Sequence, residues 1–325
     1  MSQQKEVKQI NLNSNVNRVA KYMSTQTVNP WGITAQKKFI YTANNGSLTI
    51  GKYNRKGKLD LAINTTGAGT GLVSNFKSSN FQGASLILVT ESGTIEIYKP
   101  SVDPANTAVV LTVPNGILKG VTIAKNKLYV ANFADIGVGG GNVIIYDSNF
   151  NFLSTFTDAD LIAEGYYPYN VYAHKKLIYV AFALKDGSDG VKGEGFGYID
   201  VFKLDGTFVK RLVNRTGLNE PWGLLVSKCD NYLLVGNFGD GTISIYDRKC
   251  GDFIGQVRDC YCNILYIDGL WGIYYDVCND DILFAAGIDD EANGLIGRLT
   301  NCCEKSSSKS CKSSSSSSSS SKCCH

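Results

Sequence analysis

The segment PWGLLVSKCDNYLLVGNFGDGTISIYD, residues 221–247, decides the fold. It begins with an apolar run containing a glycine, passes through a β-rich run and a glycine turn, and ends in a second β-rich run. Residues 30–50, PWGITAQKKFIYTANNGSLTI, follow the same plan, and related segments recur roughly every fifty residues. Repeats of this length with four short strands each are typical of a β-propeller. We therefore predict an all-β protein arranged as a propeller.

Six repeats can be aligned on their first strands. These strands contain Trp31-Gly32-Ile33, Gly71-Leu72-Val73, Gly120-Val121-Thr122-Ile123, Tyr169-Asn170-Val171-Tyr172, Trp222-Gly223-Leu224-Leu225 and Leu270-Trp271-Gly272-Ile273. Third strands alternate with a period of two, as in residues 94–98 and 142–147. The pattern predicts a six-bladed β-propeller of four-stranded antiparallel blades.

The two ends of the chain are expected to differ from the repeats. The last repeat has only three strands before Thr300, which would leave an unpaired edge. Residues 16–22, VNRVAKY, are expected to supply the missing strand, so that an N-terminal strand closes the ring. The predicted organisation is a polar leader at 1–14, the propeller at 15–301 and a Ser/Cys-rich low-complexity tail at 302–325. Serine runs bury little apolar surface, so the tail is expected to be disordered.

Composition narrows the functional classes. The 325 residues contain 32 Lys and Arg against 29 Asp and Glu, a net charge of +3, with no basic stripe in the sequence. This argues against nucleic acid as the main partner. No apolar run reaches about 18 residues, and residues 1–15 are polar. We therefore expect neither a membrane span nor a signal peptide.

Oxygen-bearing side chains recur where second strands end, on one face of the predicted disc. They are Asn44, Glu91, Asn132, Asp186, Asn237 and Asp289. Glu91, Asn132, Asn237 and Asp289 are the candidate ligands for a calcium ion, because hard cations prefer carboxylate and amide oxygens. The alternative is that Asn and Asp beside glycine build tight turns. No catalytic residue is proposed, since the sequence has only two histidines and no Gly-x-Ser-x-Gly motif.

Ten cysteines all lie at or after Cys229. If an internal disulfide forms, the pairing of Cys229 with Cys250 is favoured, although free thiols fit a reducing compartment equally well. Five cysteines of the tail are candidates for intermolecular crosslinking: Cys302, Cys303, Cys311, Cys323 and Cys324. Exposed, mobile thiols are accessible to exchange. The alternative is a tail that is a simple flexible extension.

Several motifs occur in a shared order. They include Asn29-Pro30-Trp31-Gly32, Gly236-Asn237-Phe238-Gly239-Asp240-Gly241, Ile267-Asp268-Gly269-Leu270-Trp271-Gly272 and Asp289-Asp290-Glu291-Ala292-Asn293-Gly294. Over residues 16–300 the chain resembles an uncharacterised family of NHL-like six-bladed propeller proteins seen mostly in bacteria. The resemblance implies the fold and carries no established activity. The abundance of Asn, Lys, Ile, Tyr and Ser is similar to that of proteins from AT-rich genomes, including giant viruses, whose Ser/Cys-rich extensions resemble those of particle-surface components.

Two functions follow from these observations. The favoured hypothesis is a non-enzymatic interaction or structural module, built into a viral particle through its tail. Its partners would be other proteins or further copies of itself, and its compartment a virion or the host cytoplasm. The alternative is an enzyme similar to calcium-dependent lactonases and gluconolactonases, with Glu91, Asn132, Asn237 and Asp289 as ligands. That alternative requires three or four of these oxygens within about 2.3–2.6 Å of one ion.

Overall fold

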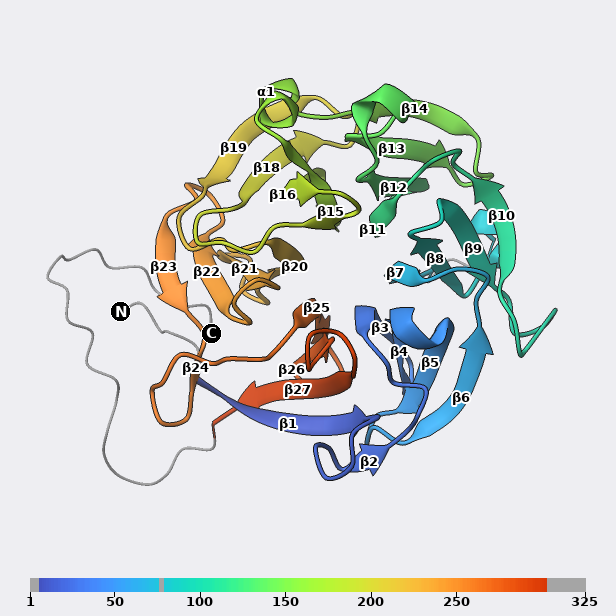
Figure 1. The fold of residues 1–325 in the computed structure, drawn as a ribbon, viewed down its shortest axis with the longest axis vertical. Helices are drawn as coiled ribbons and strands as arrows, with labels where there is room; N and C mark the ends of the chain where they lie inside the picture. The colour runs from blue at the N-terminus through green and yellow to red at the C-terminus, as the bar shows by residue number, and fades with distance from the viewer. Residues whose placement is uncertain (1–5, 76–78, 303–325) are drawn as a thin grey trace, which may run out of the picture.

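Six antiparallel sheets are arranged in a ring around a central axis (Figure 1). The computed structural model describes residues 6–75 and 79–302. Each sheet is one blade whose first strand lies innermost, and the blades follow one another around the ring in chain order. The predicted six-bladed propeller of four-stranded antiparallel blades is confirmed. The predicted disorder of the tail concerns residues 303–325, which lie outside the described residues.

The strand boundaries follow the repeats. Blade 1 contains β3 (Pro30–Gln36), β4 (Phe39–Asn44), β5 (Thr49–Asn54) and β6 (Leu59–Asn64). Blade 2 contains β7 (Gly69–Ser74), β8 (Leu86–Thr90), β9 (Thr94–Tyr98) and β10 (Ala108–Thr112). Blade 3 contains β11 (Leu118–Ala124), β12 (Lys127–Asn132), β13 (Asn142–Asp147) and β14 (Phe152–Phe156). Blade 4 contains β15 (Tyr166–His174), β16 (Leu177–Asp186), β18 (Tyr198–Lys203) and β19 (Phe208–Asn214), with the short β17 (Asp189–Gly190) paired to β16.

The last two blades complete the ring. Blade 5 contains β20 (Pro221–Val226), β21 (Tyr232–Asn237), β22 (Ile243–Asp247) and β23 (Phe253–Gln256). Blade 6 contains β25 (Leu270–Asp276), β26 (Asp281–Ala286), β27 (Leu295–Asn301) and β1 (Glu6–Ser14), with β2 (Tyr22–Met23) and β24 (Arg258–Asp259) along the outer edge of β1. The α-helix α1 (Ala159–Ala163) and three 3-10 turns, Asn45–Ser47, Phe81–Gly83 and Ile136–Val138, lie between strands. None of the helices in the described part of the chain has the length and hydrophobicity needed to cross a membrane.

The strand that closes the ring is β1, which pairs antiparallel with β27. An N-terminal strand therefore closes the ring, but the prediction that residues 16–22 form this strand was wrong. Residues 16–21 form turns that pack Val16, Val19 and Ala20 against the core between blades 5 and 6, and Tyr22 begins the short β2. The polar leader proposed for residues 1–14 thus contains the closing strand. A bulge between Asn11 and Asn13 interrupts its alternation, which hides the strand pattern in the sequence.

Apolar side chains fill the space between every pair of neighbouring blades. Each of six buried clusters combines residues of two adjacent sheets. Between blades 6 and 1, for example, Leu12 packs with Ile33, Ile40 and Leu283. Both faces of each sheet are therefore buried, and removing this apolar surface from water is the main stabilising contribution to the ring.

Glycines allow the six innermost strands to approach one another. A Cβ atom added to Gly32 would lie 2.6 Å from Leu72 N and from Thr70 O of the next blade. A Cβ on Gly71 would lie 2.7 Å from Val121 N. In blade 4 the corresponding residue is Asn170, whose side-chain amide donates to Trp222 O at 2.6 Å. Backbone contact between inner strands thus fixes the radius of the ring.

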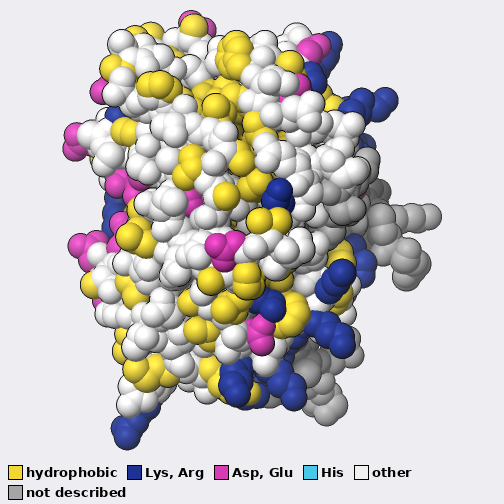
Figure 2. All heavy atoms as spheres, turned by 90° about the vertical axis from the view of Figure 1, so that its right-hand side faces the viewer, with side chains coloured by type: hydrophobic (Ala, Val, Ile, Leu, Met, Phe, Trp, Pro, Cys, Tyr) yellow, Lys and Arg dark blue, Asp and Glu magenta, His cyan; other side chains and the backbone are white. Residues whose placement is uncertain are grey.

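The two faces of the disc differ in the balance of their charges. Exposed lysines occupy turns between first and second strands and between third and fourth strands: Lys37, Lys38, Lys56, Lys125, Lys175, Lys176, Lys228 and Lys249. Exposed acids occupy turns between second and third strands: Asp135, Asp186, Asp189, Asp289 and Asp290. In the side view of Figure 2, acidic side chains gather toward the left edge and basic ones toward the right edge. We call these the acidic face and the lysine face.

Because the inner strands are in backbone contact, adding a single methyl group there is expected to destabilise the protein strongly. Gly32→Ala should lower the free energy of unfolding by at least about 2 kcal/mol, because two backbone atoms of blade 2 would have to move. The matched control is Gly137→Ala, where the added Cβ meets nothing within 4 Å. Chemical denaturation of both variants measures the effect. Equal midpoints for the two variants would contradict the role of Gly32.

Candidate functional site

Six equivalent residues, one from each innermost strand, come together at the axis of the ring. They are Trp31, Thr70, Lys119, Tyr169, Trp222 and Trp271, and all are buried. Each lies where the pairing of the first and second strands changes register. A bulge at this point re-aims the side chain relative to a regular strand. The repeat thus presents one side chain per blade at the axis.

Aromatic rings form a continuous stack there. Trp271 lies between Trp31 and Phe238, with ring centroids 3.6 and 3.7 Å away. Trp222 meets both Trp31 and Trp271 edge-on, at 6.2 and 6.0 Å. Tyr169 lies 6.1 Å from Trp271. This aromatic cluster provides a rigid apolar floor for the polar groups around it.

A cavity of about 460 Å³ lies between the innermost strands. Its lining runs from the glycine level, with Gly32 and Gly223, to Lys228 and Tyr275 near the lysine face. Trp222 of the aromatic cluster also contributes to the lining. The cavity therefore lies on the lysine-face side of the cluster, whereas the charged groups described next lie on the acidic-face side.

Lys119 brings a charge into this apolar setting. Its side chain is 0% exposed, and its Nζ donates to Glu91 Oε1 and to Asp189 Oδ1, both at 2.6 Å. The ammonium also lies 4.7 Å from the Trp31 ring and 5.7 Å from the Tyr169 ring. A buried ammonium is tolerated only when it is paired, and here two carboxylates and two aromatic rings supply that compensation.

Glu220 lies beside this group on the segment that leads into β20. The Tyr169 hydroxyl donates to Glu220 Oε1 at 3.1 Å and lies 3.3 Å from Asp189 Oδ1. Burial raises the pKa of Glu220 to about 7, with the charge of Asp189 acting in the same direction and the Tyr169 hydrogen bond opposing it. Burial, followed by the charge of Glu220, raises the pKa of Tyr169 well above 10, so Tyr169 acts as a neutral donor.

Blade 6 adds another carboxylate to the same face. Asn29 accepts a hydrogen bond from Trp271 Nε1 at 3.2 Å and donates to Glu291 Oε2 at 2.7 Å. Burial raises the pKa of Glu291, and the charge of Asp189 adds to the effect. Lys192, from the long turn of blade 4, holds its Nζ 4.7 Å from the Phe238 ring. We call the groups around Lys119, Asp189, Glu220, Glu291 and Lys192 the axial site.

Of the four candidate calcium ligands, only Glu91 belongs to the axial site. Asn132 Oδ1 accepts from the backbone N–H groups of Ile117 and Ala134. Asn237 Oδ1 accepts from Asn219 N, and Asp289 Oδ2 accepts from Asn293 Nδ2. Within the described ranges, no group of three or more His, Cys, Asp or Glu side chains is placed to hold a metal ion.

The axial site was not predicted from the sequence. Its signal was the residue immediately before the inner-strand glycine, or before Asn170 in the fourth repeat, which is Trp in three repeats and Lys119 in the third. A charged residue at a position otherwise held by aromatic residues or Thr70 marks a buried ammonium that needs partners. Those partners come from turns whose path the repeat pattern does not specify, so the carboxylates could not be assigned.

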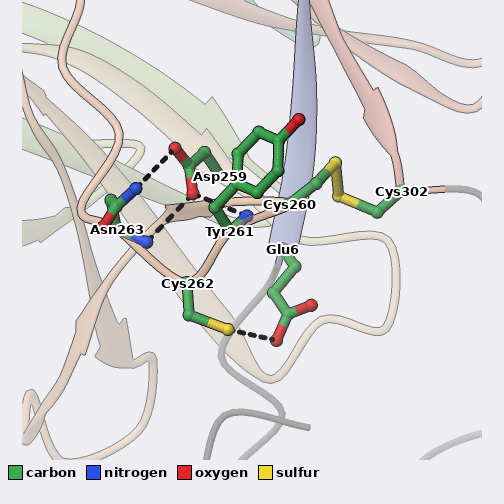
Figure 3. The surroundings of a disulfide bond; sticks show 7 residues. All are labelled: Glu6, Asp259, Cys260, Tyr261, Cys262, Asn263 and Cys302. Atoms are coloured by element: carbon green, nitrogen blue, oxygen red, sulfur yellow. Dashed lines mark hydrogen bonds between the residues drawn. A yellow bond between two sulfur atoms is a disulfide. The ribbon is translucent and has the colours of Figure 1, made fainter. Parts of the chain in front are cut away.

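The cysteines pair differently from the expected arrangement. Cys260 and Cys302 form a disulfide (Figure 3), whereas Cys229 and Cys250 are free, so the favoured pairing was wrong. Cys260 follows β24 and Cys302 follows β27, and these strands are both neighbours of β1. The disulfide therefore joins the two strands that hold the closing strand. Of the cysteines proposed for crosslinking, Cys303, Cys311, Cys323 and Cys324 lie outside the described residues.

Comparison with known proteins places the chain among viral proteins of unassigned function. Uncharacterized protein R648 of Acanthamoeba polyphaga mimivirus is 32% identical over 319 residues, covering 88% of this chain and 78% of that protein. Uncharacterized protein L690 of the same virus is 33% identical over 320 residues, covering 88% and 83%. No protein-family model matches, so the NHL-like relationship stays a resemblance.

Solved structures share the fold at low sequence identity. A luciferin-regenerating enzyme superposes with a TM-score of 0.59 at 12% identity, covering 85% of this chain and 92% of that one. A streptogramin B lyase gives a TM-score of 0.57 at 11% identity, covering 91% and 97%. At such identities the likeness establishes the propeller architecture and leaves activity open.

The buried carboxyl of Glu220 predicts a pH-dependent stability difference. Between its ordinary pKa of 4.5 and about 7, the folded protein holds a proton that the unfolded chain releases, so stability falls as pH rises through this window. Glu220→Gln removes this loss. Relative to the parent, its free energy of unfolding should rise by up to roughly 3 kcal/mol between pH 4.5 and pH 8. Unfolding curves at several pH values measure it, with exposed Glu194→Gln as control. Parallel pH profiles for the parent and Glu220→Gln would contradict the assignment.

Proposed function

This chain belongs to the family of mimivirus proteins that includes R648 and L690, and we propose that it is a non-enzymatic propeller serving as an interaction or structural module of a viral particle. The observation that carries the proposal is the Lys119 ammonium at the axis of the acidic face. The chain's own cation is paired with Glu91, the candidate calcium ligand that belongs to the axial site. A fixed internal cation favours a rigid binding surface over a hydrolytic centre.

The donor groups support the same proposal. Calcium takes six to eight oxygen ligands, and backbone N–H groups in their own turns already engage the amide oxygens of Asn132 and Asn237. Glu91 is held by Lys119 and by Asn45 Nδ2 at 3.1 Å. Asn132 Oδ1 already accepts two hydrogen bonds, so its use for a metal would require breaking a bond that orders the turn.

The surface offers two routes to partners. The acidic face and the lysine face are electrostatically complementary, which suits both other proteins and further copies of this chain. The tail provides a second route, in which Cys303, Cys311, Cys323 and Cys324 anchor or crosslink the propeller by thiol–disulfide exchange. Cys302 is left out of this set because its sulfur is bonded to Cys260.

Mass spectrometry of purified viral particles tests the location. We expect the protein to remain in the particles after their surface has been washed with high salt. On non-reducing gels it should migrate as disulfide-linked species. A chain ending at Cys302 should run as a monomer on the same gels while retaining its fold by circular dichroism. Absence from washed particles, or identical monomeric migration of both chains under oxidising conditions, would overturn this part of the proposal.

Calorimetric titration with calcium separates the two functions. We expect no binding heat and no thermal shift on adding Ca²⁺, because the oxygens of Asn132 and Asn237 are already committed. The control is Asn237→Asp, which adds a negative charge at the same turn. This variant should also fail to bind Ca²⁺ if the four candidate ligands do not lie around one ion. Saturable binding that is lost in Glu91→Gln would instead favour the hydrolase.

A further inference from the structure

The axial site contains more carboxylates than cations. Asp189 comes from β17, Glu220 from the segment before β20, and Glu291 from the turn after β26. Burial raises the pKa values of Glu220 and Glu291, and the charge of Asp189 adds to the rise in both. The charge of Glu291 also raises the pKa of Glu220, which indicates that the three groups lie within electrostatic range. Lys119 and Lys192 are the cations among them, and Glu91 and Asp290 add further negative charge. The site therefore has more acidic groups than cations to pair with them.

One carboxylate of the axial site has a buried oxygen without a partner in the described part of the chain. Glu220 is 1% exposed, and its Oε2 has no hydrogen-bond partner among the described residues. The indole N–H groups of Trp31 and Trp222 in the aromatic cluster are likewise unpaired in the described part of the chain. A buried carboxylate oxygen left unpaired is costly, so this atom is available to accept a hydrogen bond from a further group.

Lys192 indicates the chemistry of that group. Its ammonium lies over the face of Phe238, whose ring stacks on Trp271, and lies 3.6 Å from Asp290 Oδ1. Burial raises the pKa values of Glu220 and Glu291, and the charge of Lys192 opposes that rise in both groups. Unlike Lys119, which is fully buried, the Lys192 side chain is 51% exposed. The Lys192 side chain can therefore move into solvent, whereas that of Lys119 cannot.

We propose that the axial site binds a primary alkylammonium group, in the place taken by the Lys192 ammonium over the Phe238 ring and beside Asp290, with the carboxyl groups of Glu220 and Glu291 in the same site. This inference deepens the proposed binding function by naming the ligand chemistry. The ammonium belongs either to a free amine or to a lysine side chain of a partner protein. An aromatic ring with several carboxyl groups around it suits an organic cation.

Lys192 acts in this arrangement as an internal competitor. It reaches the site from the turn at residues 187–197, which is tied down by Gly193 N donating to Asn219 Oδ1 at 2.7 Å and by Gly195 N donating to Leu218 O at 2.8 Å. The turn therefore stays in place when the Lys192 side chain leaves. A ligand must displace one ammonium with another, so removing the internal ammonium should strengthen binding.

Calorimetric titration of the full chain tests this competition. The probes are n-butylammonium, for a free amine, and Nα-acetyl-lysine N-methylamide, for a protein lysine. Lys192→Ala should bind them about ten-fold more tightly than the parent, because one competing cation over an aromatic ring is removed. Lys203→Ala, which removes an exposed lysine near the opposite face, should bind like the parent. Tighter binding of the lysine derivative than of butylammonium would point to a protein partner, and equal binding to a free amine.

Two further measurements keep the test independent of folding. The Nε-acetylated lysine derivative has the same shape without the charge and should not bind Lys192→Ala. The double variant Glu220→Gln, Glu291→Gln should lose binding while its circular dichroism spectrum stays that of the parent. Equal affinity of the parent and Lys192→Ala, binding of the neutral derivative, or no heat with any variant would overturn the site. Absence of the protein from viral particles would not overturn the ammonium site. The two proposals can therefore fail separately.

Discussion

The backbone contact between innermost strands is the constraint on which the rest of the structure depends. At Gly32 and Gly71 the next blade lies so close that no side chain fits. This contact sets a small radius, and it brings the residue before each glycine to the axis. Where blade 4 lacks the glycine, Asn170 replaces the contact with a hydrogen bond to Trp222 O. The same feature that closes the ring therefore also gathers the axial side chains.

The aromatic stack and the charges around it follow from that radius. Rings as large as Trp31, Trp222 and Trp271 fill the axis and exclude water, so the ammonium of Lys119 must find its partners in the protein. Asp189 supplies one of them from a turn of blade 4. That ion pair ties an otherwise exposed turn to the axis, which in turn positions Lys192 over Phe238. One buried charge thus orders a surface loop.

The sequence was sufficient for the blade number and the strand order, because hydrophobic alternation and turn glycines are local signals. It was insufficient where structure depends on contacts distant in the chain. The bulge at Asn11 to Asn13 breaks the alternation of β1, so the closing strand was placed at residues 16–22. The disulfide depends on β24 running along β1, which brings Cys260 to Cys302 across 42 residues. The axial site joins side chains from several blades, and only the ring brings them together.

The net charge of +3 conceals a strong separation, because topology sends alternate turns to opposite faces. Acidic turns surround the axial site, whereas the cavity opens toward lysines such as Lys228. The field of the acidic face raises the local concentration of cations at Glu220 and Glu291 and repels anions. The lysine face does the reverse. An approaching ammonium is therefore directed to one end of the axis, and this sidedness follows from strand order together with the lysines in the turns.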